Sequence, residues 1–120
     1  MSGGGKQVAD IIQERRGKKT HLCFQIVDGR SSPQMLTVKR IDRADVMLSY
    51  ASFAAAELTD DESRIEGDFH SRMITVVGFS LAEVFEGLSD HRVTYLRELA
   101  EGHFAESDAG VITKIEIWTK

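Results

Sequence analysis

The hydrophobic pattern of the chain changes its period along the sequence. Apolar residues alternate with polar ones over 111–118, and residues 73–77 form a short apolar run rich in β-branched side chains, so both segments are predicted strands. Over 81–88 the apolar residues recur instead at the spacing of one helix face. Ser80 and Glu83 stand three residues apart before that face, which is the spacing of a capping box. We therefore expect a strand that leads directly into a capped amphipathic helix.

Further strands are predicted from β-branched and aromatic composition. The segments with this composition are 21–27, 35–41, 46–50 and 64–69. Turn-forming residues fill 28–33, so we expect the first two segments to pair as an antiparallel hairpin. Segments 51–58 and 92–99 fit either a helix or a strand, and we favour a strand for both.

The N-terminal region carries a different pattern. Residues 1–5 contain three glycines and predict a flexible tail. Apolar residues at helical spacing over 6–16, followed by Gly17, predict a short helix. The predicted fold class is therefore α+β: a mostly antiparallel sheet or small barrel of about six to seven short strands, an N-terminal helix, and one amphipathic helix at 81–88. We expect residues 6–120 to form a single α+β domain.

Length and composition support one core. The chain has 120 residues, of which 42% are hydrophobic, and a chain of this size buries roughly two thirds of the surface that its unfolded form exposes. No apolar run approaches the ~20 residues that a membrane-spanning helix needs, so we expect no membrane association. Cys23 is the single cysteine, which excludes an intrachain disulfide and favours a cytoplasmic location.

Charge is distributed unevenly between the two halves of the sequence. Residues 1–50 contain nine Lys/Arg and five Asp/Glu, a net charge of +4, whereas residues 51–120 contain six and fourteen, a net charge of −8. A basic patch could bind nucleic acid. The candidate residues for such a patch are Arg15, Arg16, Lys18, Lys19, Lys39, Arg40 and Arg43.

The sequence contains none of the familiar short motifs for catalysis, phosphate binding or metal binding. Glu66 and Asp68 share one face of a predicted strand and could act as an acid/base pair, with His70 close by, if a cleft enclosed them. Gly67 between them predicts an exposed bulge instead, and His70-Ser71 predicts the following turn. We therefore assign no catalytic, cofactor or metal residue and expect no cofactor.

The function predicted first is a non-catalytic interaction module whose partner is another protein or a second copy of the chain. Its expected contact surface lies at Tyr50 to Ala56 or at Trp118, where apolar or small residues stand on predicted strands. Nucleic-acid binding through the basic N-terminal half is the first alternative. A small enzyme with an acidic and histidine site is the second.

Overall fold

The computed structural model describes residues 18–20, 23–28, 33–100 and 110–120, with only the backbone described at 18–20. This part of the chain contains nine strands, one α-helix and one 3-10 turn. They are β1 (Lys18–Thr20), β2 (Phe24–Val27), β3 (Met35–Lys39), β4 (Val46–Ser49), η1 (Tyr50–Ser52), β5 (Ala55–Leu58), β6 (Arg64–Phe69), β7 (Arg72–Phe79), α2 (Ala82–Ser89), β8 (Val93–Arg97) and β9 (Val111–Thr119).

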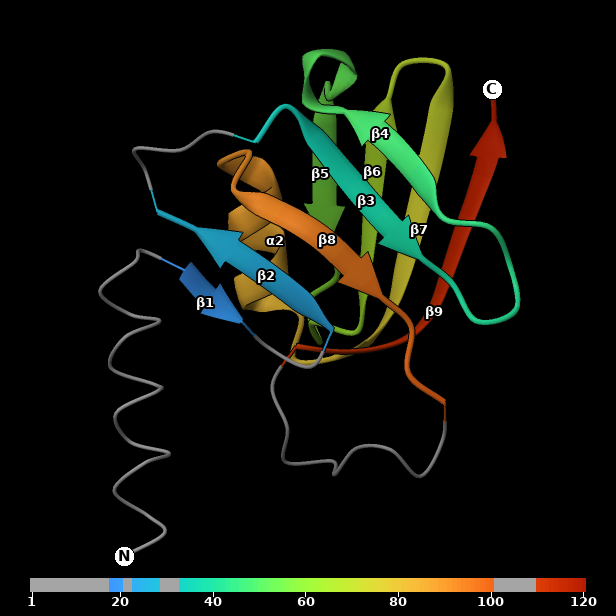
Figure 1. Cartoon of the computed structure of the whole chain (residues 1–120). Helices are drawn as coiled ribbons and strands as arrows, with labels where there is room; N and C mark the ends of the chain where they lie inside the picture. Colours follow the sequence, from blue (N-terminus) through green and yellow to red (C-terminus); the bar gives the residue numbers. More distant parts are fainter. Residues whose placement is uncertain (1–17, 21–22, 29–32, 101–109) are drawn as a thin grey trace, which may run out of the picture.

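The strands form two sheets that face each other as two layers (Figure 1). The first, called sheet A, has the order β1-β2-β8-β3-β4, and the second, sheet B, has the order β5-β6-β7-β9. Strand β8 is antiparallel to β2 but parallel to β3. In sheet B every neighbouring pair is antiparallel. Helix α2 lies beside β5, at the opposite side of sheet B from β9 (Figure 1).

One hydrophobic core joins both sheets and the helix. Leu36 and Leu96 enter it from sheet A, Ile74 and Ile115 from sheet B, and Val84 from α2. All five side chains are almost completely buried. At about 25 cal/mol per Å² of apolar surface removed from water, this shared interior is the main stabilising contribution to the fold.

The predicted fold class is wrong, because the described chain is mostly β. Residues 18–20, just beyond the predicted helix, form β1. The strand favoured at 92–99 is confirmed as β8, whereas only the second half of 51–58 is a strand, β5, after the 3-10 turn η1. The predicted N-terminal helix at 6–16 and the tail at 1–5 lie outside the described residues. The amphipathic helix is confirmed as α2, one residue later than expected.

The predicted hairpin of 21–27 with 35–41 is also wrong. Strands β2 and β3 do not pair, because β8 lies between them and bonds to both. Strand β3 instead forms its hairpin with β4 through the turn at 40–45, where Asp42 has a φ of 57°.

Two local details differ from the prediction, one at the start of α2 and one in sheet B, and a third agrees. Leu81, not Ser80, is the N-cap of α2 and makes no side-chain capping bond, while Ser80 has a φ of 52°, so the capping box does not form. Gly67 is buried in regular register opposite Ile74 and is not a bulge. The bulge of sheet B lies between β7 and β9, where the register shifts between Val77 and Gly78 and leaves Thr113 of β9 without an opposite residue. An added Cβ at Gly78 would stand 1.8 Å from the Val111 carbonyl oxygen. The turn at His70-Ser71 is confirmed.

Candidate functional site: the open edge of β9

Strand β9 is an edge strand, and part of its backbone has no partner in the described structure. Lys120 N–H donates to the Ser71 carbonyl, toward β7, whereas Ile115 N–H points the other way and donates to Glu98. Because N–H and C=O directions alternate along an antiparallel strand, those of Ile117 and Thr119 also point away from β7. No described residue bonds to them. The open edge therefore consists of the N–H and C=O groups of these two residues, together with the Ile115 carbonyl, which by the same alternation also points away from β7.

Glu98 closes the first part of this edge. Its carboxylate accepts the Ile41 N–H through Oε1 and the Ile115 N–H through Oε2, both at 2.7 Å. Its own N–H donates to the Lys39 carbonyl, and the next residue, Leu99, donates to the Ile112 carbonyl. Glu98 thus connects the end of β3 in sheet A to β9 in sheet B and leaves N–H donors of the edge open only beyond Ile115.

A groove of about 450 Å³ runs along β9 at this place. It is lined by Ile41, Arg43, Glu98 and residues 114–118 of β9. Ile41 is 45% exposed and Trp118 42% exposed, which is high for large apolar side chains. Exposed apolar side chains beside an unpaired strand are typical of a surface that binds another chain.

The charged residues on β9 are paired within the chain. Lys114 Nζ lies 2.8 Å from Glu116 Oε1, and this hydrogen bond with its charge lowers the pKa of Glu116 below its ordinary value. At the end of the strand, Lys120 Nζ lies 2.8 Å from Asp68 Oδ1. Both pairs are solvent-exposed, so either lysine or either acid can take a new partner at small cost.

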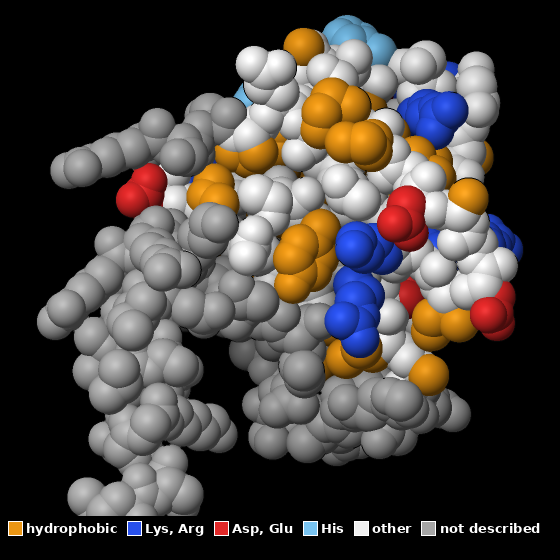
Figure 2. Space-filling view, in the orientation of Figure 1, with side chains coloured by type: hydrophobic (Ala, Val, Ile, Leu, Met, Phe, Trp, Pro, Cys, Tyr) orange, Lys and Arg blue, Asp and Glu red, His pale blue; other side chains and the backbone are white. Residues whose placement is uncertain are grey.

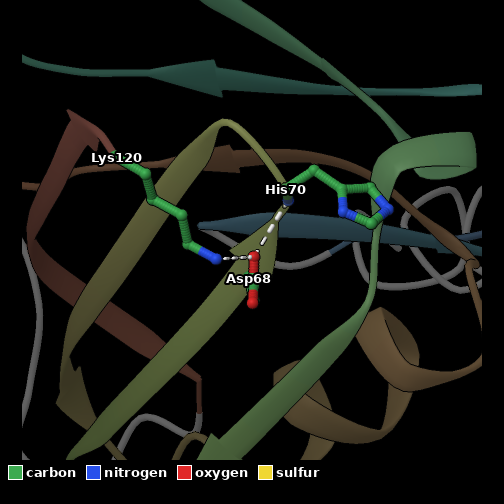
Figure 3. Close-up of polar contacts among 3 residues, drawn as sticks. All are labelled: Asp68, His70 and Lys120. Atoms are coloured by element: carbon green, nitrogen blue, oxygen red, sulfur yellow. Dashed lines mark hydrogen bonds and ion pairs between the residues drawn. The ribbon is translucent and has the colours of Figure 1, made fainter.

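The side chains of Glu66, Asp68 and His70, the residues of the enzymatic hypothesis, do not bond to one another in the described structure. Asp68 accepts the backbone N–H of His70 at 2.9 Å, and the imidazole points away from the carboxylate (Figure 3). The bond from Lys120 lowers the pKa of Asp68, which keeps it ionised and unsuited to act as an acid near neutral pH. Glu66 Oε1 lies 3.2 Å from Arg64 Nη2 in an exposed ion pair. The groove beside them, about 220 Å³, is lined by Glu66 and Asp68 but not by His70.

Of the seven residues predicted to bind nucleic acid, the structure describes the side chains of three, Lys39, Arg40 and Arg43. Arg15 and Arg16 lie outside the described residues, and Lys18 and Lys19 are described only by their backbone in β1. Of the remaining three, Lys39 is exposed with its Nζ 5.9 Å from the centre of the Tyr95 ring. Arg40 is partly buried and its Nε has no hydrogen-bond partner, whereas Arg43 lines the groove along β9.

Aromatic, polar and cationic side chains lie next to one another on the outer face of sheet A. The pairings Gln25 with Tyr95, Tyr95 with Thr37, and Thr37 with Met47 place these four side chains in one row across the sheet. Lys39 and Arg97 lie opposite each other in the next row of side chains on the same face. Figure 2 shows cationic side chains next to hydrophobic ones near the middle of this face.

The predicted contact surface at Tyr50 to Ala56 is not one exposed surface. Tyr50 is buried, its hydroxyl donates to the Val93 carbonyl at 2.6 Å, and its ring stacks on His91. Phe53 is half-buried beside them. Trp118, the other predicted contact residue, is exposed on β9.

Glu98 was not identified from the sequence. Its two acceptor bonds reach across 57 and 17 residues, so no local spacing signals them.

Among the described residues, no group of three or more His, Cys, Asp and Glu side chains is placed to hold a metal ion. No helix in this part of the chain is long and apolar enough to cross a membrane. Comparison of the chain with family models, curated proteins and solved structures found no match.

Proposed function

We propose that the protein is a non-catalytic interaction module that binds an extended segment of a protein through the open edge of β9. The observation that carries the proposal is the outward direction of the N–H and C=O groups of Ile117 and Thr119, beside a groove with exposed Ile41 and Trp118. An added strand would satisfy these four backbone groups, and its alternate side chains would contact the groove and Trp118.

A proline at position 119 tests this proposal directly. Proline has no N–H, so Thr119→Pro removes one donor of the open edge, yet the position is exposed and its N–H serves no bond to β7. Thr119→Ala is the matched control, because it shortens the side chain and keeps the donor. The ligands are extended peptides selected from a displayed library on the wild-type chain.

Selected peptides should bind the wild type and Thr119→Ala equally and bind Thr119→Pro about tenfold or more weakly, since one lost hydrogen bond contributes about 1 kcal/mol and proline also obstructs close approach of a strand. Amide hydrogen exchange should slow at Ile117 and Thr119 when the peptide is bound. Equal affinity for both variants, or unchanged exchange at these two amides, would show that the edge is not the binding site.

Single-stranded nucleic acid is a second candidate ligand, at the outer face of sheet A. The observation in its favour is the half-buried Tyr95 ring beside Lys39 and Arg97, since an aromatic ring can stack a base while cations contact phosphates. A fluorescent oligonucleotide should bind in a salt-dependent manner and lose affinity with Tyr95→Ala. No binding at low salt excludes this candidate.

The proposed location is the cytoplasm, where thiols stay reduced. Its support is Cys23, which is buried and accepts the Ile112 N–H at 3.2 Å, as expected of a structural thiol.

A further inference from the structure

We infer that the segment bound at the β9 edge is β9 of a second copy of this chain, antiparallel to the first and related to it by a two-fold axis through Trp118. The inference rests on the proposed function and names the partner. It follows from three features of the edge. They are the unpaired backbone groups of Ile117 and Thr119, the Ile115 N–H that already donates to Glu98, and the side chains at positions 116, 118 and 120.

The open backbone groups are complementary to themselves in only one such register. With the axis at Trp118, Ile117 of each copy lies opposite Thr119 of the other, and their N–H and C=O groups form four hydrogen bonds. The N–H and C=O groups of Ile117 and Thr119 are then satisfied in both copies. The antiparallel arrangement is the usual one for strands that meet at an edge.

Glu98 excludes the neighbouring register. An axis at Ile117 would pair Ile115 with Thr119 of the other copy and would need the Ile115 N–H, which already donates to Glu98 at 2.7 Å. The carboxylate occupies the place that the incoming carbonyl would take. Displacing it would also break its bond to the Ile41 N–H, so the axis at Trp118 is favoured.

The side chains on the outer face of sheet B fit the same register. Trp118, which is 42% exposed, lies directly opposite Trp118 of the second copy, where side chains of an antiparallel pair approach most closely. Glu116 lies opposite Lys120 of the second copy, and this pair occurs twice. Opposite charges there select this partner and register, while the tryptophans and backbone bonds supply most of the affinity.

Such a dimer would join the two copies of sheet B into one eight-stranded sheet, since each contributes the four strands of the order β5-β6-β7-β9. The contact is isologous, so it uses both β9 edges and closes at two subunits. The opposite margin of sheet B, at β5, lies beside α2 (Figure 1).

A charge exchange between copies tests the inference. Glu116→Lys alone places lysine opposite Lys120, and Lys120→Glu alone places glutamate opposite Glu116, so each variant should be monomeric in sedimentation velocity at concentrations where the wild type is dimeric. Mixed in equal amounts, the two variants should form a heterodimer, because both opposing pairs are then of opposite charge. Glu57→Lys, the same charge change at an exposed position of β5 on the opposite margin of sheet B, is the control and should leave the dimer intact.

A second test concerns the backbone. Thr119→Pro removes one hydrogen bond on each side of the axis and should raise the dimer dissociation constant about 30-fold, whereas Thr119→Ala should leave it nearly unchanged. Circular dichroism and thermal unfolding establish that the variants are folded.

The outcomes separate this inference from the proposed function. A wild type that stays monomeric up to about 1 mM overturns the second copy as partner. If selected peptides still bind that monomer and lose affinity with Thr119→Pro, the proposed function stands. A dimer that is insensitive to Thr119→Pro and does not respond to the charge exchange uses another surface, and this result also overturns the inference.

Discussion

Replacing Glu98 with glutamine should destabilise the protein more than its surface position suggests. The carboxylate accepts one N–H from the turn after β3 and one from β9, each at 2.7 Å, so it bonds the two sheets at a point where they have no common ladder. Glutamine is nearly the same size, but one of its two terminal atoms donates. One of the two N–H groups would then face another donor.

The size of the effect follows from the two bonds. Hydrogen bonds to a charged group contribute about 1.5–3 kcal/mol each, so losing one of them should lower the free energy of unfolding by about 2 kcal/mol. Glu98→Ala removes both acceptors. Water can reach the exposed Ile41 N–H, but Ile115 is buried, so the alanine variant should lose about 3 kcal/mol.

Urea unfolding at one fixed protein concentration measures both values, because a dimer would make stability depend on concentration. Glu57→Gln is the matched control: it removes an exposed carboxylate from β5 that has no described hydrogen bond or ion pair. A loss in Glu98→Gln that lies within about 0.5 kcal/mol of this control would refute the assigned role of the carboxylate.

Four further substitutions probe other parts of the fold. Phe24→Ala should cost about 3–5 kcal/mol and Phe85→Ala clearly less, because Phe24 is fully buried and Phe85 only half-buried; thermal and urea unfolding compare them. Tyr50→Phe should cost about 1 kcal/mol through the lost bond to Val93. Burial raises the pKa of Tyr50 above its usual 10, so wild-type stability should fall as pH rises beyond 10, and less so in Tyr50→Phe. Hydrogen bonds from Ser63 and Thr59 lower the pKa of Asp61 below 3.8, so the stability it contributes is present above 3.8 and should disappear as pH falls through that lowered value. Asp61→Asn should lack this acid-dependent loss in urea unfolding between about pH 5 and 2.

Segments with a strong local pattern were predicted correctly. The alternation over 111–118 became β9, the apolar run at 73–77 became the middle of β7, and the helical spacing over 81–88 became α2. Each of these patterns reports which face of one element is buried, and burial of that face is what the core requires.

Predictions that depended on contacts between segments distant in the sequence were wrong. A hairpin between β2 and β3 was the simplest reading of the turn residues at 28–33, but β8, more than fifty residues later in the chain, lies between the two strands. The capping box failed for a related reason. The backbone at Ser80 is fixed by bonds outside the helix, from Gly110 N–H to its carbonyl and from Leu81 N–H to Glu62, and it takes a positive φ that a cap residue does not have.

One part of the candidate site could be predicted from a local pattern, whereas the other part depends on contacts between distant segments. Trp118 could be identified from the sequence, because a large aromatic residue on the polar side of an alternating strand is unusual. Whether its strand lies at an edge depends on the order of all four strands in sheet B, and whether that edge is open depends on Glu98. One carboxylate therefore has two consequences: it joins the sheets, and it limits the open backbone to the part of β9 on either side of Trp118. A variant without this carboxylate should be less stable and should also lose the restriction on register, so the two consequences can be measured on the same protein.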